Sequence, residues 1–240
     1  MAVYTHLTSA QISTYIAPFA VGELVTFKGI SGGIENTNYF VTTHIDGQPE
    51  QDFVLTLFED LGYEEIPYFV ELTEHLVAHK VTVPAPLRDT QGTALSWLAG
   101  KPALLFPRFA GDHLARSDIG TAECAIMGAE LARLHVAGQQ FTIARHSHRG
   151  ATWWNQLGPQ AADCIDPEDA TMLMMAIGQY DAMQAQVPDL PMGVVHGDLF
   201  HDNALFNQGQ LSATIDLYNA SNDYLLFDVA VTVNDWCIAP

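Results

Sequence analysis

The first hundred residues alternate between short β-type runs and amphipathic helical patterns. Thr8 and Gln11 fit a capping box, which predicts a short helix that ends before Pro18. From Glu65 to the residues before Pro84, apolar side chains recur at spacings of three and four, and this spacing predicts one longer helix. The β-rich runs, separated by turn signals, are 24–27, 38–43, 53–58, 95–98 and 101–106. Together they predict a small antiparallel sheet that carries one main helix.

The second half of the chain has a different pattern, with long helical stretches and few β-rich runs. Ser117 or Asp118 is a candidate cap for a long helix that continues through Gly138. Asp166 precedes a proline and is predicted to cap a further helix, with that proline in its first turn. The pattern therefore predicts a sheet-containing lobe over 1–106 and a mainly helical lobe over 107–240, joined by a hinge.

Composition and charge exclude several classes of protein. Hydrophobic residues make up 48% of the 240 residues, which is enough for a buried core and excludes intrinsic disorder. The formal net charge of −19 would repel nucleic acids and anionic membrane surfaces, so neither is an expected partner. Three widely spaced cysteines without metal-binding spacing favour reduced thiols in a cytoplasmic protein. The oligomeric state is not indicated.

The most informative segment is a polar loop between two apolar runs. It begins at His196 and contains Asp198 and Asn203, five positions apart; Asp216 follows thirteen positions after Asn203. This is the spacing of the catalytic loop and metal-binding aspartate of kinases. Phosphoryl transfer needs hard oxygen ligands for Mg²⁺ and an acceptor for the proton of the attacking hydroxyl. The alternative is an ordinary polar turn, in which aspartate, asparagine and glycine are common.

A glycine-rich loop lies between the first two predicted strands. In a nucleotide-binding lobe such a loop would place its backbone N–H groups over the phosphates of ATP. A plain hairpin turn explains the same residues when they are considered alone. The candidate nucleotide-binding residues of this loop are Ser31, Gly32, Gly33, Asn36, Thr37 and Asn38.

Four segments together resemble a known family. They are 32–41, 196–203, 215–220 (I-D-L-Y-N-A) and 234–237 (N-D-W-C). Over nearly the whole chain they are similar to the homoserine kinases of the aminoglycoside phosphotransferase and choline kinase-like superfamily. The resemblance implies an α+β, bilobal, protein-kinase-like fold. It also implies transfer of the γ-phosphoryl group of ATP, with Mg²⁺, to the hydroxyl of L-homoserine, a step of threonine biosynthesis.

The resemblance also assigns roles to individual residues. Asp198 becomes the catalytic base, Asn203 and Asp216 become the Mg²⁺ ligands, and the loop over 31–38 covers the phosphates. Leu105 and Phe106 would lie in the hinge beside adenine. Because homoserine carries an ammonium and a carboxylate, its pocket should offer both an acid and a cation. The candidate substrate-binding residues are His201, Tyr218, Asn219 and Asp223, with Arg108 as an alternative for the carboxylate.

Two features depart from the kinase pattern. Thr56 stands where protein kinases have a lysine on the third strand, so Glu71 on the following helix is expected to lack its usual partner. Members of the family continue for several helices beyond the N-D-W-C segment, so we expect this chain to be either a shortened version or a fragment, with a shortened helical lobe.

Two alternative functions remain open at the level of the sequence. The first is a related phosphotransferase whose acceptor is choline, ethanolamine, a thiosugar or an aminoglycoside. The second is a nucleotide-binding module without turnover. Intact Asp198, Asn203 and Asp216 favour an enzyme over such a module.

Overall fold

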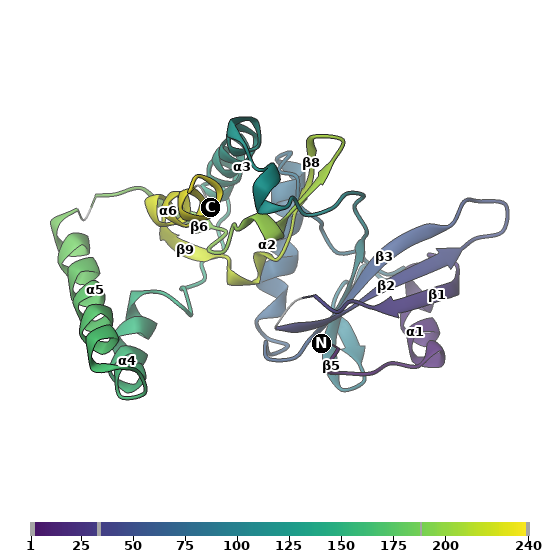
Figure 1. The fold of residues 1–240 in the computed structure, drawn as a ribbon. Helices are drawn as coiled ribbons and strands as arrows, with labels where there is room; N and C mark the ends of the chain where they lie inside the picture. The colour runs from purple at the N-terminus through teal and green to yellow at the C-terminus, as the bar shows by residue number, and fades with distance from the viewer. Residues whose placement is uncertain (1–2, 33–34, 188, 239–240) are drawn as a thin grey trace. The chain divides into compact units, whose positions relative to one another are not determined.

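The computed structural model describes residues 3–32, 35–187 and 189–238. The chain divides into two compact units, Met1–His113 with Ala204–Ile215, and Leu114–Asn203 with Asp216–Pro240 (Figure 1). The first unit therefore includes a segment from late in the chain, whereas the split predicted from the sequence is a single point near Phe106. Both units combine helices with antiparallel strands.

The first unit is built on a five-stranded antiparallel sheet with the strand order β1-β2-β3-β5-β4. All five strands predicted from the β-rich runs are present. Their bounds are β1 (Glu23–Gly29), β2 (Asn36–His44), β3 (Gln51–Phe58), β4 (Ser96–Leu98) and β5 (Lys101–Pro107). Strand β3 lies in the middle, and its residues Phe53, Leu55, Thr56, Leu57 and Phe58 are all buried. The sheet thus has buried side chains on both of its faces in this strand.

Helix α1 (Ser9–Ile16) covers one face of this sheet. Its N-terminus has the predicted capping box, in which Thr8 and Gln11 each accept a hydrogen bond from the backbone of the other. The buried side chains of Ile12 and Ile16 belong to the same apolar cluster as Leu55 of the central strand. Helix α2 (Ile66–Ala78) is the predicted amphipathic helix and buries seven of its side chains.

The hairpin formed by β7 (Ala204–Asn207) and β8 (Gln210–Thr214) belongs to the first unit although it follows the polar loop in sequence. The backbone N–H and the hydroxyl of Thr214 both donate to the carbonyl of Thr82, at 2.7 and 3.1 Å. In the other strand of the hairpin, β7, Phe206 forms an antiparallel backbone bridge with Asp112. These contacts explain why the hairpin packs with the residues that follow α2 and β5.

Over its described residues, the second unit contains two short paired strands, four α-helices and three short 3₁₀ turns. The bounds are η2 (Arg116–Asp118), α3 (Thr121–Gly138), α4 (Ala151–Ala162), α5 (Pro167–Gln186), β6 (Met192–Val195), η3 (His201–Asn203), η4 (Leu217–Asn219), β9 (Ser221–Tyr224) and α6 (Leu225–Trp236). Asp166 is the N-cap residue of α5, as predicted.

The predicted cap of α3 is wrong. Ser117 and Asp118 lie in the separate turn η2, and the helix begins after Gly120, whose N–H donates to the Glu123 side chain.

Over the residues that the structure describes, no helix is long and apolar enough to cross a membrane.

Gly22 is the tightest backbone position in the first unit and gives a test of the sheet. Its φ is +94°, and a Cβ atom there would lie 2.2 Å from the carbonyl oxygen of His44 at the end of β2. We expect Gly22→Ala to lower the free energy of unfolding by about 2–5 kcal/mol in urea titrations, because left-handed strain and steric overlap add. Gly47→Ala is the control, since its φ is +79° but nothing lies within 4 Å. It should cost only about 1–2 kcal/mol. Equal costs would contradict the predicted overlap.

Candidate active site

The polar loop predicted to carry the chemistry follows strand β6, whose last two residues are buried. His196, at its start, is fully buried, and its Nδ1 accepts a hydrogen bond from the backbone N–H of Asp198 at 3.3 Å. Gly197 has a φ of +79°, and a Cβ atom on it would lie 3.1 Å from the carbonyl oxygen of Asn219. A side chain at this position would therefore be strained and crowded. The loop turns sharply here and directs the chain towards Asp198.

A buried carboxylate on helix α6 anchors the start of this loop. Asp228 is completely buried. Its Oδ2 accepts hydrogen bonds from the N–H of His196 at 2.8 Å and from Nε2 of His135 at 2.9 Å, and its Oδ1 accepts one from the N–H of Gly197 at 2.9 Å. A carboxylate removed from water is stable only when its oxygens are satisfied in this way. His135 is therefore hydrogen-bonded inside the core.

A second carboxylate on α6 holds the end of the loop. Asp235 accepts hydrogen bonds from the N–H and from Nδ1 of His201, at 2.7 and 2.9 Å, and forms an ion pair with Arg116. Burial alone would raise the pKa of Asp235, but the hydrogen bonds from His201 and Arg116 outweigh it and hold this pKa below its usual range. The ring of His201 thus helps to fix the loop; its predicted contact with substrate stays a prediction.

Between these two anchors, Asp198 and Asn203 contact each other. The amide Nδ2 of Asn203 donates to the backbone carbonyl of Asp198 at 2.7 Å and to its carboxylate Oδ2 at 3.1 Å. Both side chains are half-buried. The amide therefore fixes the orientation of the carboxylate, and the Oδ1 of Asn203 is a hard oxygen that could hold a cation.

Asp216 lies at the start of the turn η4, which returns the chain to the loop. Its backbone is left-handed, with a φ of +62°, and its side chain is exposed. Such a conformation is uncommon for a residue other than glycine, and aspartate is one of the few that adopt it readily. The same turn ends at Asn219, whose carbonyl packs against Gly197. The segment that carries Asp216 is thus packed against the loop that carries Asp198.

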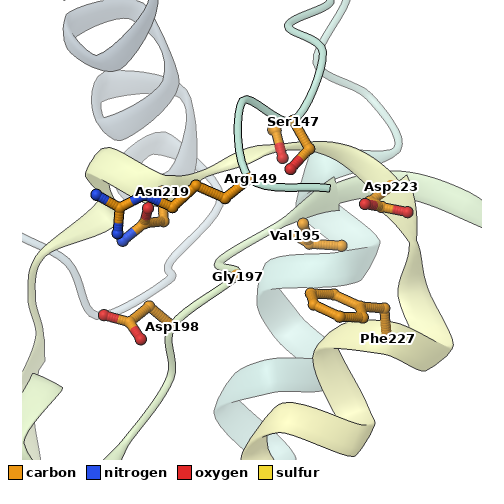
Figure 2. A pocket seen from close by; sticks show the side chains of 9 residues that line it. Ser147, Arg149, Val195, Gly197, Asp198, Asn219, Asp223 and Phe227 are labelled. Carbon is orange, nitrogen blue, oxygen red and sulfur yellow. The ribbon is translucent and has the colours of Figure 1, made fainter. Parts of the chain in front are cut away.

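A pocket of about 130 Å³ opens beside Asp198 in the second unit (Figure 2). Asn219 and Asp223, two of the predicted substrate-binding residues, line it together with Asp198. Tyr218 is half-buried and is not one of the described residues that line this pocket, so its predicted role stays a prediction. The lining residues are Ser147, Arg149, Val195, Gly197, Asp198, Asn219, Ser221, Asp223 and Phe227.

The predicted nucleotide-binding residues lie in the first unit. Ser31 and Gly32 are exposed after β1, whereas Gly33 lies outside the described residues. Asn36 and Thr37 are buried at the start of β2. The hydroxyl of Thr37 accepts hydrogen bonds from the N–H groups of residues 4 and 5 and donates to the carboxylate of residue 59 at 2.6 Å. Thr37 therefore helps to hold the N-terminal segment in place.

The position of the usual kinase lysine is occupied by a hydroxyl group. Thr56 donates to the side-chain Oδ1 of Asn38 at 2.7 Å, across the β2–β3 pair. Glu71 does not pair with a lysine of the third strand; instead, the guanidinium of Arg88 lies 3.4 Å from its carboxylate on the exposed side of α2. The hinge candidates Leu105 and Phe106 lie buried in β5, where Leu105 also accepts a backbone hydrogen bond.

The sequence analysis missed three residues that shape this site, namely Asp228, Asp235 and Arg149. Asp228 had a detectable signal, since it is a lone charge within the apolar run of α6. Such a charge is usually buried and paired. Asp235 lies in the N-D-W-C segment, but nothing in the sequence identifies His201 and Arg116 as its partners. Arg149 is exposed on a loop, as most arginines are, yet it also lines the pocket.

Comparisons with known proteins agree with this geometry. A model of the phosphotransferase enzyme family matches residues 26–240. The homoserine kinase of Cupriavidus pinatubonensis is 39% identical over an alignment of 244 positions, which covers 99% of this chain and 73% of that protein. The homoserine kinase of Ralstonia pickettii is 40% identical over 248 residues, with the same coverage. The solved structure of aminoglycoside 2'-phosphotransferase-IIIa with GDP has a TM-score of 0.70 at 17% identity, over 95% of this chain and 79% of that one. The predicted α+β, bilobal, kinase-like fold class is confirmed.

The anchoring role of Asp228 predicts a large loss of stability when its charge is removed. Asp228→Asn retains the shape of the side chain but replaces one accepting oxygen by an amide N–H₂ group. That group would face at least one of the three donors that now bond to the carboxylate. We expect the free energy of unfolding to fall by about 2–4 kcal/mol in urea titrations at pH 7. Asn234→Ala, an exposed change on the same helix, should stay within about 0.5 kcal/mol of the parent. An Asp228→Asn protein as stable as this control would contradict the anchor.

The lowered pKa of Asp235 predicts a dependence of stability on acid pH. The pKa lies below its ordinary value of 3.8 in the folded protein, so the ionised carboxylate stabilises the fold above that value. This stabilisation is lost as the pH falls through the folded pKa. The difference in unfolding free energy between the parent and Asp235→Asn should be constant above about pH 5 and should shrink below it. A difference that stays constant down to about pH 2.5 would contradict this assignment.

Proposed function

Because the chain belongs to the phosphotransferase enzyme family, we propose that it transfers the γ-phosphoryl group of ATP to the side-chain hydroxyl of L-homoserine. The observation that carries this proposal is the contact between Asp198 and Asn203 in a loop that opens on a small polar pocket. Relatives about 40% identical over 99% of the chain are named homoserine kinases. The product would be O-phospho-L-homoserine.

In the proposed reaction, Asp198 accepts the proton of the attacking hydroxyl. The acceptor oxygen forms a bond to the γ-phosphorus as the bond from that phosphorus to the β,γ-bridging oxygen breaks, and ADP leaves. A general base must lie within hydrogen-bonding reach of the proton it removes. The hydrogen bond from Asn203 holds one oxygen of the Asp198 carboxylate at 3.1 Å and so limits the rotation of the base. This restriction supports an in-line arrangement of hydroxyl and phosphoryl group.

We infer that the Oδ1 of Asn203 and the carboxylate of Asp216 would hold Mg²⁺, which would neutralise charge on the phosphate oxygens. Among the described residues, no group of three or more acidic, histidine or cysteine side chains could hold a metal. Kinase magnesium sites do not need such a group, because substrate phosphates and waters complete the coordination.

The size of the pocket favours a small acceptor over an aminoglycoside. Pockets for drug-sized ligands are about 300–1,000 Å³, whereas the pocket beside Asp198 is about 130 Å³. Homoserine is a short amino acid and needs little more space than this. The half-buried side chains of Asn219 and Asp223 supply polar groups beside the proposed base. These features support homoserine rather than a large cationic sugar.

The nucleotide-binding assignments remain part of this proposal. We infer that ATP contacts the exposed Ser31 and Gly32 through backbone N–H groups, because such groups are the usual partners of phosphates in glycine-rich loops. The adenine contact with Leu105 and Phe106 and the cytoplasmic location stay predictions.

The role of Asp198 can be tested by steady-state kinetics. We expect Asp198→Asn to lower kcat for homoserine-dependent ADP formation by about 10²–10⁴, because a general base contributes that much. The KM for ATP should change by less than about threefold, since a base that acts on the acceptor does little for nucleotide binding.

Asp202→Asn is the matched control, because Asp202 is an exposed acid in the same loop. Its kcat should equal that of the parent. Turnover by Asp198→Asn at the parental rate would contradict the assignment of the base, and no turnover of homoserine by the parent would contradict the proposed acceptor.

A further inference from the structure

The pocket beside Asp198 contains one feature that the proposed chemistry has not used, a cationic side chain. Among the described residues that line it, Arg149 carries the one positive charge, and Asp198 and Asp223 carry the negative charges. A cation and two carboxylates in so small a pocket indicate a ligand that itself carries both charges.

The loop that carries Arg149 is fixed to strand β9. The N–H of Arg145 donates to the side-chain oxygen of Asn222 at 2.9 Å, and the N–H of Asn222 donates to the carbonyl of Arg145 at 2.7 Å. Gly150 lies so close to Asp223 that a Cβ atom on it would be 3.5 Å from Oδ2. These contacts hold the loop over the pocket, so Arg149 is placed by the fold although its side chain is exposed.

Asp223 lies at a less polar part of the pocket. Phe227 lines the pocket with it, and Trp154 contacts both Phe227 and Tyr180, with ring centroids 6.0 and 4.9 Å apart. Burial raises the pKa of Asp223, the N–H of Tyr224 opposes this shift, and the charge of Asp228 adds to it. Among the described residues, Asp223 takes part in no ion pair. A partly desolvated carboxylate of this kind binds a cation strongly.

The two charged side chains project into the pocket from different elements. In Figure 2, Arg149 extends towards Asn219, above Asp198, while Asp223 and Phe227 lie on the other side of the pocket. This arrangement leaves Asp198 for a hydroxyl group and provides separate partners for a carboxylate and an ammonium.

We propose that Arg149 binds the α-carboxylate and Asp223 the α-ammonium of the acceptor, so that this pocket selects a zwitterionic amino alcohol. The inference rests on the proposed phosphoryl transfer at Asp198. An arginine guanidinium can donate two parallel hydrogen bonds to a carboxylate. Choline, ethanolamine and aminoglycosides lack that carboxylate and would leave Arg149 without its ligand. Arg149 and Asp223 are thus specificity-determining residues of the acceptor site.

Three acceptors test each charge separately: L-homoserine, 3-aminopropan-1-ol, which lacks the carboxylate, and 4-hydroxybutanoate, which lacks the ammonium. In the parent, each deletion should lower kcat/KM by about tenfold to hundredfold. In Arg149→Ala the penalty for deleting the carboxylate should disappear, while the penalty for deleting the ammonium remains. Asp223→Asn should show the opposite pattern. Each pairing of variant and analogue forms a double-mutant cycle.

Matched variants control for general effects on the loop and on acidic charge. His146→Ala changes an exposed side chain of the same loop that does not line the pocket, and Asp181→Asn removes an acid of α5 near Tyr180. In both variants, the loss of kcat/KM for each of the two analogues relative to homoserine should equal the loss in the parent. Arg149→Lys should recover part of the carboxylate preference, because it keeps the charge but loses the planar fork.

Three outcomes would overturn the inference, two in the kinetics and one in a binding experiment. If Arg149→Ala lowers kcat/KM for all three acceptors by the same factor, Arg149 acts on the phosphoryl group or on the loop rather than on the carboxylate. If the parent shows no preference between homoserine and the two analogues, the pocket does not select a zwitterion.

Isothermal titration calorimetry separates a failure of this inference from a failure of the proposed function. Homoserine that binds, with affinity lost in Arg149→Ala, but is not phosphorylated would contradict the reaction and support the subsite. Absence of homoserine binding would overturn the subsite.

Discussion

The loop proposed to carry the catalytic base depends on a carboxylate that is completely withdrawn from water. Asp228 accepts three hydrogen bonds, two of them from consecutive backbone N–H groups at the start of the loop. A buried charge of this kind is costly unless each oxygen is satisfied. If the loop moved away from Asp228, the buried carboxylate would lose two backbone hydrogen bonds, at a large cost in free energy. This constraint fixes the backbone at His196 and Gly197, the two residues that directly precede Asp198.

Helix α6 holds both ends of the loop. Asp228 binds its start, and Asp235, two helical turns later, binds His201 near its end. Between these anchors the amide of Asn203 fixes the carboxylate of Asp198. Catalytic groups need supports that restrict their positions more closely than a free loop would. The acids that position the loop are thus separate from the acids assigned to the chemistry, which explains why an apolar helix carries two buried aspartates.

The sequence predicted those parts of the molecule that depend on local patterns. The five strands, the capping box of α1 and the polar loop all follow from periodicity or spacing along the chain. Helix α4 was not predicted, because Gly158 and Pro159 interrupt its helical pattern, yet the helix continues through both. The partners of Asp228 and Asp235 and the entry of Arg149 into the pocket depend on contacts between distant segments. A single sequence does not show such contacts, whereas it does show the residue types that make them.

Phosphorus-31 NMR of the protein incubated with ATP, Mg²⁺ and L-homoserine shows directly whether this site phosphorylates the hydroxyl of a small amino acid, as we propose. We expect a new phosphomonoester resonance that grows in step with ADP and shows coupling to the C4 methylene protons of homoserine. Growth of inorganic phosphate alone, or no change in the ATP resonances, would contradict the proposed transfer.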